Sequence, residues 1–279
     1  MEKITFVVFT YNEERRIEYV LRCFQKYGKI LVMDNYSTDN TAQIARQYGA
    51  EVCLHKHNGW VEEEQVANNV LSQITTPWVY WGYCDEVLPR QLLDKLAKVS
   101  QQEQYKLVVI PKRNLTYGME DFVMLKKDTN PRFFRKGYVS FKDNVIHKIG
   151  EFLGKEDEIL YLKRKKEYSI IHCSTYNIEK YMNTINSYSS IEAQQKQQKE
   201  NSFFVGLIIK PLYSFLKRYF SDGSYKFGYS GFIMCMPYLI LEFLIAAKSW
   251  ENKNNLTIGN IEDRYDIIKE EILNDIAKK

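Results

Sequence analysis

The sequence has few cysteines and no cysteine pair. Its five cysteines are an odd number, lie far apart and include no CxxC motif, so neither a disulfide framework nor a zinc ribbon fits their spacing. The first apolar run covers only residues 4–9 and has no cleavage signature, which is too short for a signal peptide. We therefore expect a cytosolic protein with reduced thiols.

A strong charge of either sign is also missing. The formal net charge is +4 at pH 7, too small an excess to indicate a nucleic-acid partner. Apolar residues make up 45% of the chain and charged residues 27%, which excludes a disordered, collagenous or polytopic membrane chain. The 279 residues are enough for one large domain, or for one domain with an appendage.

Tyrosine is abundant, with 21 residues among an aromatic content of 14%. The side chain combines an apolar ring with a polar tip, which suits wet clefts and membrane interfaces. A proteome that is generally rich in Lys, Asn, Ile and Tyr explains the number of tyrosines equally well.

The first half of the chain alternates strand-like and helix-like segments. Strands are expected at 4–9, 29–33, 51–54 and 78–81, and helices at 13–27, 41–48 and 61–74. This alternation predicts βαβ units and a mostly parallel sheet. Ligands of such sheets bind outside the carboxyl ends of the strands, so the loops that begin at Thr10, Asp34 and Tyr83 are the places to look for chemistry.

The second half has a different pattern. Short apolar segments between 105 and 171 predict an antiparallel extension of the sheet, and helical periodicity returns from Asn177. The very polar stretch 194–201 predicts a boundary between a catalytic domain, 1–200, and a helical segment, 201–279.

Two apolar segments, 203–220 and 231–247, follow this boundary. Pro237 and Glu242 interrupt the second one, which is also marginal in length for a membrane span. Basic flanks and Trp250 favour an interfacial amphipathic helix on the cytoplasmic face of the membrane; the alternative is a core helix pair. The tail from residue 260 is one more amphipathic helix, with apolar residues at Ile261, Tyr265, Ile268, Ile272 and Ile276.

Two polar segments stand at predicted strand ends. In the first, VMDNYSTDNT at 32–41, the acid at the strand end can accept hydrogen bonds from a nucleobase or ribose, although such a run alone indicates only a turn. The second, WGYCDE at 81–86, has two carboxylates directly after an apolar strand. Hard divalent cations prefer carboxylate oxygen and bridge to substrate phosphates.

These motifs together resemble the family 2 glycosyltransferases, and the resemblance covers nearly the whole chain in order. The stretches that carry it are FTYNEERRIEYVLRCF, ILVMDNYSTDNTAQIARQYGAEV, WVYWGYCDEVLP, NPRFFRKGYVSFKDNVIHKIG, IIHCSTYNIEKYMNTINSYSSIEA and DGSYKFGYSGFIMCMPYLILEFLIAAKSWE. The last two resemble a subgroup, the lipopolysaccharide-core glucosyltransferases, which are membrane-associated through such a C-terminal segment. The resemblance implies the α/β GT-A fold, Rossmann-like with a mostly parallel sheet and an antiparallel extension, followed by C-terminal amphipathic helices.

The resemblance also implies the site residues of an enzyme that uses a nucleotide-sugar donor and a divalent metal, Mn or Mg. The metal ligands would be Asp85 and His172, although a structural role for His172 is the alternative. Residues expected to line the nucleotide site are Thr10, Tyr11, Asn12, Glu13, Asp34, Asn68, Tyr83 and Cys84. Residues expected to hold an anionic acceptor or the donor diphosphate are Arg132, Arg135 and Glu86, with a solvated strand face as the alternative for the arginines.

Three positions depart from the family pattern. Tyr83 stands where the family has the first acid of Asp-Ala-Asp-Glu, which puts metal dependence in question. Ala67 stands where the family has an arginine before Asn68. Lys148 stands where the family has the glutamate of Val-His-Glu, so no glutamate is present at this position to serve as the base.

An inverting transfer needs a general base to deprotonate the acceptor hydroxyl. His147 can titrate near neutral pH, and Asp143 lies on the same loop, so both are candidates beside Asp85 for the catalytic set. The remaining alternative is a histidine that only hydrogen-bonds its own loop.

The sequence thus predicts an inverting transferase that moves a sugar from a nucleotide-sugar, UDP-linked by expectation, to a glycan or glycolipid of the cell envelope. The acceptor is lipopolysaccharide core or capsule, and the cytoplasmic membrane surface is a partner while nucleic acid is not. One alternative is a peptide or protein glycosyltransferase, and another is a nucleotide-sugar-binding protein that has lost catalysis. The oligomeric state stays open.

Overall fold

The computed structural model describes residues 3–56, 64–124, 131–142, 144, 149–175, 177–195 and 205–277. They form two compact units that divide between Asn177 and Ile178, and each unit is described by itself. The boundary predicted near residue 200 falls within 196–204, outside the described residues. Helix α5 (Ile178–Gln195), which precedes it, belongs to the second unit.

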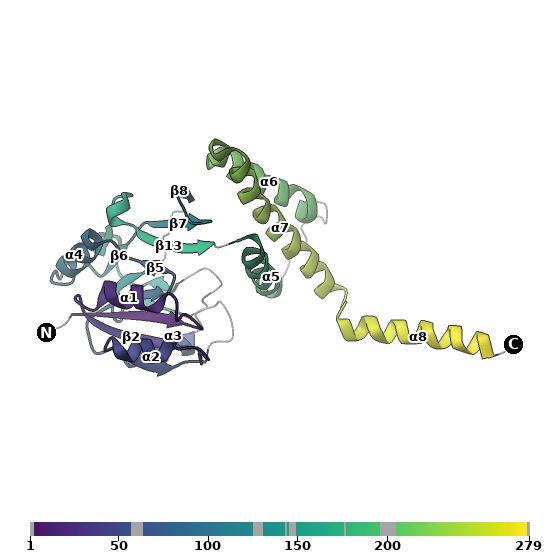
Figure 1. The fold of residues 1–279 in the computed structure, drawn as a ribbon, viewed down its shortest axis with the longest axis horizontal. Helices are drawn as coiled ribbons and strands as arrows, with labels where there is room; N and C mark the ends of the chain where they lie inside the picture. The colour runs from purple at the N-terminus through teal and green to yellow at the C-terminus, as the bar shows by residue number, and fades with distance from the viewer. Residues whose placement is uncertain are drawn as a thin grey trace. The chain divides into compact units, whose positions relative to one another are not determined.

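A sheet forms the centre of the first unit (Figure 1). It has seven strands in the order β12-β6-β9-β4-β1-β2-β3. Its strands are β1 (Ile4–Thr10), β2 (Lys29–Asp34), β3 (Glu51–Leu54), β4 (Trp78–Tyr83), β6 (Leu107–Val109), β9 (Phe133–Arg135) and β12 (Ile159–Tyr161). The first four are parallel, as predicted. Strand β9 is antiparallel to both of its neighbours, so the sheet is mixed but mostly parallel.

Helices cover both faces of this sheet because side chains alternate along each strand. Phe6 and Val8 point to one face, where they pack against Leu21 of α1 (Ile17–Phe24) and Leu92 of α4 (Arg90–Val99) in one buried cluster. Val7 points to the other face and joins the apolar side of α3 (Glu64–Ser72). Helix α2 (Thr41–Gln47) connects β2 to β3 and contributes Ala45 to the first cluster. The predicted strands and helices of the N-terminal half are therefore present in the predicted order.

The remaining strands of this unit lie in two smaller sheets. A four-stranded sheet has the order β5-β13-β7-β8, and a two-stranded one pairs β10 with β11. Their bounds are β5 (Glu86–Val87), β7 (Lys112–Thr116), β8 (Met119–Met124), β10 (Val139–Ser140), β11 (Glu151–Phe152) and β13 (Ile170–Thr175), with single 3-10 turns η1 (Glu156–Glu158) and η2 (Lys166–Tyr168). The stretch expected as one antiparallel extension thus divides over three sheets. Strand β5 follows β4 after a two-residue turn, so the main sheet passes into the second sheet at Asp85 and Glu86.

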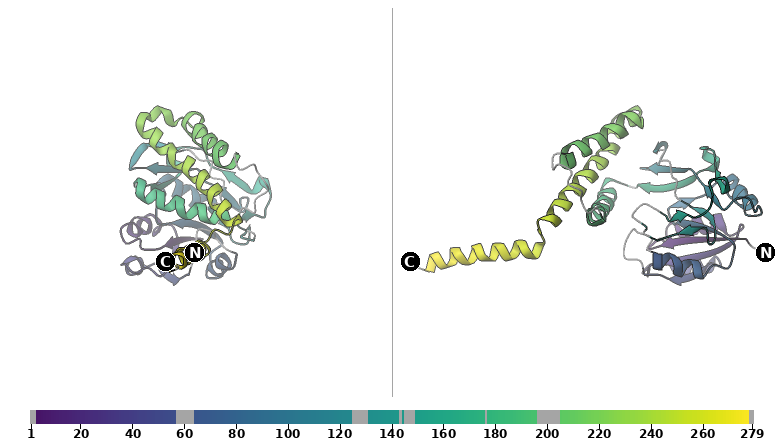
Figure 2. Two further views of the ribbon diagram at one scale, coloured as in Figure 1. Left: turned by 90° about the vertical axis from the view of Figure 1, so that its right-hand side faces the viewer. Right: turned by 180° about the vertical axis from the view of Figure 1, so that it is seen from behind.

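The second unit is helical. It contains α5, η3 (Val205–Ile209), α6 (Lys210–Leu216), η4 (Lys217–Ser221), η5 (Ser224–Phe227), α7 (Gly228–Lys253) and α8 (Ile258–Ala277). Helices α5 and α6 both pack against α7, as both views in Figure 2 show. The segment Ser224–Lys253 is the one helix of the described residues that is long and apolar enough to cross a membrane. It contains the predicted apolar segment 231–247 and is longer than that prediction.

Candidate functional site

Two loops meet at the carboxyl ends of β1 and β2, where Thr10 lies opposite Asp34. The buried carboxylate of Asp34 accepts hydrogen bonds from the Thr10 hydroxyl, at 2.9 Å, and from the backbone N–H of Ser37, at 3.0 Å. The backbone N–H of Asn12 donates to the Ser37 hydroxyl at 2.8 Å. The side-chain oxygen of Asn12 accepts a hydrogen bond from the Thr38 N–H, also at 2.8 Å. These bonds join the two loops into one rigid edge.

Two tyrosines project from this edge. Tyr11 and Tyr36 are 58% and 55% exposed, so their rings are accessible. Asn12 and Tyr36 both have a positive φ, 53° and 59°, a conformation that is uncommon outside glycine and is typical of functional loops. The neighbouring Glu13 forms an ion pair with Arg16. The edge therefore offers aromatic faces beside polar side chains, which suits a nucleobase and its ribose.

The acidic turn after β4 lies next to this edge, because Tyr83 is the β-sheet partner of Phe9. The ring of Tyr83 packs against Phe9, with 5.8 Å between ring centroids, and the Arg132 guanidinium lies 5.0 Å from its centre. Cys84 is buried, and burial raises the pKa of its thiol well above the usual range. The position of the family's first acid is thus filled by a packed aromatic ring, and Asp85 is the partly exposed acid of the turn.

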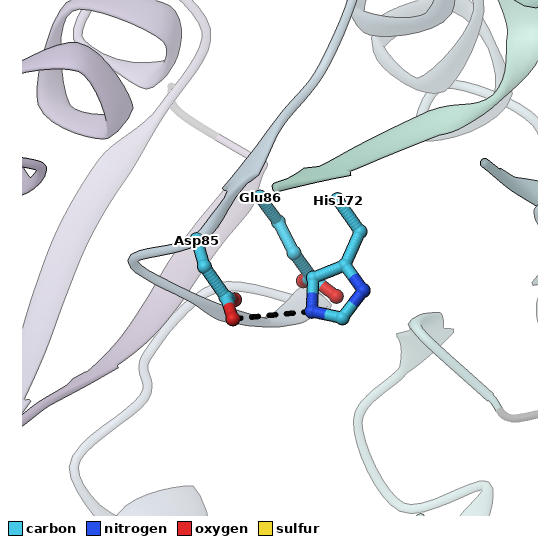
Figure 3. A group of neighbouring side chains, drawn as sticks. All are labelled: Asp85, Glu86 and His172. Carbon is cyan, nitrogen blue, oxygen red and sulfur yellow. Dashed lines mark hydrogen bonds and ion pairs between the residues drawn. The ribbon is translucent and has the colours of Figure 1, made fainter. Parts of the chain in front are cut away.

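Strand β13 brings His172 to Asp85 (Figure 3). The distance between His172 Nε2 and Asp85 Oδ2 is 3.1 Å, and His172 Nδ1 lies 2.6 Å from Oδ1 of Asn114 on β7. Burial acts to raise the pKa of Asp85, but the hydrogen bond and charge of His172, together with the charges of Lys112 and Arg16, outweigh it and lower that pKa to about 2. The Asp85 carboxylate is therefore charged at neutral pH.

Glu86 points toward the same histidine but has other partners. Its buried carboxylate forms ion pairs with Arg132, which is also buried, and with Lys112 at 3.1 Å. Burial acts to raise the pKa of Glu86, and the charges of the two cations outweigh it and lower the pKa. Two positive charges balance this carboxylate, so it anchors the turn rather than offering a free ligand.

A divalent cation fits two of these side chains. One ligand atom each from Asp85, Glu86 and His172 lies within 4.8 Å of the others. A bound cation would take the place of the proton between His172 Nε2 and Asp85. Nδ1–H would meanwhile still donate to Asn114, which is the orienting contact that metal-bound histidines usually have. A carboxylate and an imidazole fit Mn²⁺ or Mg²⁺ when substrate phosphates and waters complete the shell.

The structure brings most of the predicted nucleotide and metal residues to one edge of the sheet. Asn68 lies exposed on α3, and Ala67 beside it is fully buried in the core. Arg132 is 1% exposed and pairs with Glu86, so it supports the turn from inside.

Arg135 is not brought to this edge. It lies opposite Trp78, the first residue of β4, and pairs with the exposed Glu103. Because β9 runs antiparallel to β4, the later residue of the strand lies at the end of β4 that is remote from Asp85. The candidate bases Asp143 and His147 lie outside the described residues.

Sequence reasoning missed Lys112 and Asn114, the partners of Glu86 and His172. Both lie on β7, two residues apart, and the register pairs Asn114 with His172. Two-residue periodicity would place the side chains at 112 and 114 on one face of a strand, but Arg113 between them is also charged, so the pattern does not single this face out. Nothing in the sequence shows that this strand pairs with one 58 residues later.

Proteins similar to this chain match it over most of its length. An uncharacterized glycosyltransferase, RP128 of Rickettsia prowazekii (strain Madrid E), is 29% identical over 93% of this chain and 92% of its own. The lipopolysaccharide core biosynthesis glycosyltransferase LpsC of Rhizobium meliloti (strain 1021) is 25% identical over 90% of this chain and 93% of its own. Among solved structures, the mannosyltransferase PcManGT of Pyrobaculum calidifontis, in complex with GDP-Man and Mn²⁺, aligns with a TM-score of 0.50 at 13% identity, over 90% of this chain and 88% of that one; this likeness supports the GT-A fold.

The model of the family "Glycosyl transferase family 2" matches residues 5–161, which include the loops after β1 and β2, the acidic turn and the strand of Asn114. The mixed sheet, the loops at its carboxyl edge and this match agree with one another. The chain is a glycosyltransferase with the GT-A fold and belongs to glycosyl transferase family 2.

Proposed function

We propose that this enzyme transfers a sugar from a UDP-sugar, with inversion and with the aid of a divalent cation, to a glycan of the cell envelope. The observation that carries the proposal is the Asp85–His172 pair, 3.1 Å apart, beside the loop edge that Tyr11 and Asp34 form. A nucleoside diphosphate can lie with its base on the loops and its phosphates at this pair. The cation would neutralise the departing diphosphate.

The protein's own residues bind and orient the donor. The exposed ring of Tyr11 offers a stacking surface for the base. The buried Asp34 carboxylate accepts hydrogen bonds from Thr10 and Ser37, so it holds together the two loops that would contact the ribose and the base. Asp85 and Asn114 together hold the imidazole of His172 in one orientation.

Deprotonation of the acceptor hydroxyl requires a base near the anomeric carbon. We assign it to His147 or Asp143, because Lys148 replaces the family's acid at the neighbouring position. Replacement of each in turn distinguishes them: loss of sugar transfer with unchanged UDP binding identifies the base.

The cell-envelope acceptor rests on similarity to the lipopolysaccharide core protein, which extends through the C-terminal part of the chain. A peptide acceptor and a decayed, non-catalytic protein are the competing functions. Transfer of labelled sugar to lipid extracts supports the proposal. Transfer to peptides only, or neither transfer nor donor hydrolysis by a protein that binds UDP, contradicts it.

Membrane association completes the proposal, through an apolar and basic patch of the second unit that we name the interfacial patch. Its large exposed side chains are Ile208, Ile209, Leu212, Tyr213, Leu216, Phe220, Tyr225, Phe227 and Tyr229. Four basic residues and one acidic residue lie within 205–229, which favours an anionic lipid surface.

An interfacial position fits this unit better than a spanning one. Lys248 of α7 donates hydrogen bonds to Asn186 and Ser190 of α5, at 2.7 and 2.8 Å. A spanning α7 would carry this polar helix into hydrocarbon, where such groups are costly. The proposed location is therefore the cytoplasmic face of the membrane, with the interfacial patch in the headgroup region.

Calorimetric titration with UDP, with and without Mn²⁺, tests the donor site. We expect Mn²⁺ to strengthen UDP binding to the wild type and to have little effect on Asp85→Asn or His172→Gln. Asp157→Asn is the matched control, because Asp157 is an exposed acid on η1. Equal enhancement by Mn²⁺ in all variants refutes the metal assignment, and no UDP binding under any condition refutes the uridine assignment.

Co-sedimentation with vesicles tests the interfacial patch. Replacing Lys210, Lys217 and Lys226 by glutamine should weaken binding to anionic vesicles about fivefold per residue, since each lysine near such a surface contributes about 1 kcal/mol. The triple variant Lys163→Gln/Lys165→Gln/Lys166→Gln, on exposed lysines of the first unit, is the control. Equal binding of both triple variants contradicts the assignment of the patch.

A further inference from the structure

Helix α8 presents an apolar seam that no described residue of the second unit covers. None of its 20 residues is buried, and Ile258, Tyr265, Ile268 and Ile272 are 83%, 52%, 52% and 56% exposed. Together with Ile261 these residues are spaced 3, 4, 3 and 4 apart. This is the a/d spacing of a coiled coil. Figure 1 shows α8 continuing beyond α7 as a single helix.

The charge of α8 argues against a lipid surface as the partner of this seam. Residues 258–277 contain six acidic and two basic side chains, whereas the interfacial patch is basic. An acidic helix is repelled by anionic lipid. The partner of the seam is therefore a protein surface, and a heptad seam fits another helix.

The charged residues on either side of the seam indicate which helix pairs with it. Glu262 and Lys269 lie on one flank of the seam, and Arg264 and Glu271 lie on the other. With the seam residues as a and d, these four occupy the e and g positions that set partner and orientation.

We propose that α8 pairs with α8 of a second copy of this chain as an antiparallel two-helix coiled coil. In the register that places Ile261 opposite Ile272 and Tyr265 opposite Ile268, all four central layers are apolar. The same register places Glu262 opposite Lys269 of the second copy and Arg264 opposite Glu271 of the second copy. All four flanking pairs, counted with their two-fold equivalents, are then attractive.

A parallel pairing lacks this complementarity. It places Arg264, at g, opposite Lys269 of the second copy, at the following e position. The two-fold symmetry repeats this contact, so a parallel dimer would contain two repulsive pairs. Lys269 is already oriented along its flank by acids of its own helix, with Asp266 at 2.7 Å and Glu262 at 3.7 Å. The pattern thus specifies orientation as well as partner.

Sedimentation equilibrium of the full chain tests the proposal through charge reversal. Glu262→Lys sets two lysines against each other at both ends of the seam, and we expect dimer affinity to fall about tenfold, since each exposed pair contributes a few tenths of a kcal/mol and two pairs change sign. Glu262→Lys/Lys269→Glu should restore it. Glu270→Lys is the control, because it changes the net charge equally on the outward f position.

Arg264→Glu tests the orientation. It weakens an antiparallel dimer by opposing Glu271 and strengthens a parallel one by opposing Lys269. A stronger dimer for this variant overturns the antiparallel register, and a wild-type chain that stays monomeric at all concentrations overturns the pairing. Loss of vesicle binding by Ile268→Asp, with no change of mass in solution, assigns the seam to lipid and also overturns the proposal. No α8 residue is buried, so these variants leave the helix unit folded.

Discussion

Replacing Glu86 by glutamine should destabilise the first unit strongly. The side chain of Glu86 is fully buried, and so is its partner Arg132, with 1% of its side chain exposed. Glutamine keeps the shape and removes the charge, which takes the negative charge of Glu86 away from a buried arginine cation. Lys112 is 17% exposed and can turn its ammonium to water, whereas Arg132 cannot.

Breaking a buried pair from one side costs about 3–5 kcal/mol. Because glutamine retains one hydrogen-bond acceptor, we expect the lower end, about 3 kcal/mol. For a unit of this size that corresponds to a fall in Tm of about 6–12 °C. Urea unfolding followed by the fluorescence of the buried Trp78 and Trp81 measures the change in the free energy of unfolding.

The matched control is Glu103→Gln, whose carboxylate is 77% exposed while it pairs with Arg135. A surface pair contributes about 0–1 kcal/mol, so this variant should unfold almost as the wild type does. The double variant Glu86→Gln/Arg132→Met removes both charges and should be more stable than the sum of the single changes by about 1–3 kcal/mol. A Glu86→Gln protein within about 0.5 kcal/mol of the wild type would refute the reasoning.

Three further outcomes are expected. Burial acts to raise the pKa of Asp39, but hydrogen bonds from Thr41 and from the Glu14 backbone lower it below 3.8. Its contribution to stability is present above that value and is lost as the pH falls below it. Asp39→Asn should therefore be less stable than the wild type at neutral pH and approach it at acid pH in urea titrations. Gly28→Ala should lower the free energy of unfolding by about 1–3 kcal/mol in the same assay, because a Cβ there would lie 2.3 Å from the Ile4 carbonyl oxygen. Gly49→Ala is the control, because no atom lies within reach of its Cβ. Its cost therefore measures backbone strain without a clash. Tyr11→Ala should weaken UDP binding by about tenfold or more through lost stacking, while Tyr11→Phe should bind as the wild type; equal affinity of all three proteins contradicts the stacking role.

The sequence was sufficient for the parts of the site that follow directly from local pattern. Strands β1, β2 and β4 are apolar runs that end in polar loops, and parallel pairing brings those ends together. Thr10, Asp34 and Asp85 could therefore be placed at one edge before the structure was known. The left-handed backbone conformation at Asn12 and the hydrogen bonds between the two loops do not follow from such a pattern.

The remainder depends on pairings between distant strands. Asn114 reaches His172 only because β7 pairs with β13, and no periodicity reports that register. Arg132 and Arg135 looked equivalent in sequence, three residues apart. The antiparallel insertion of β9 separates them, with Arg132 buried against the acidic turn and Arg135 at the far end of β4.

The replacement of the family's first acid by Tyr83 has a consequence for how metal and donor bind. The charged groups of the turn are Asp85 and Glu86, and Arg132 and Lys112 already balance Glu86. When a divalent cation takes the place of the Nε2 proton of His172, that imidazole is a neutral ligand. The single negative charge that these residues then offer the cation is the one on Asp85. Such a site binds the bare ion weakly, and the diphosphate of the donor supplies the missing charge. Metal and UDP are therefore expected to strengthen each other's binding by the same factor, because coupling between two ligands is reciprocal. Titration of Mn²⁺ alone should accordingly show far weaker binding than titration in the presence of UDP, and equal affinities would mean that other residues complete the metal site.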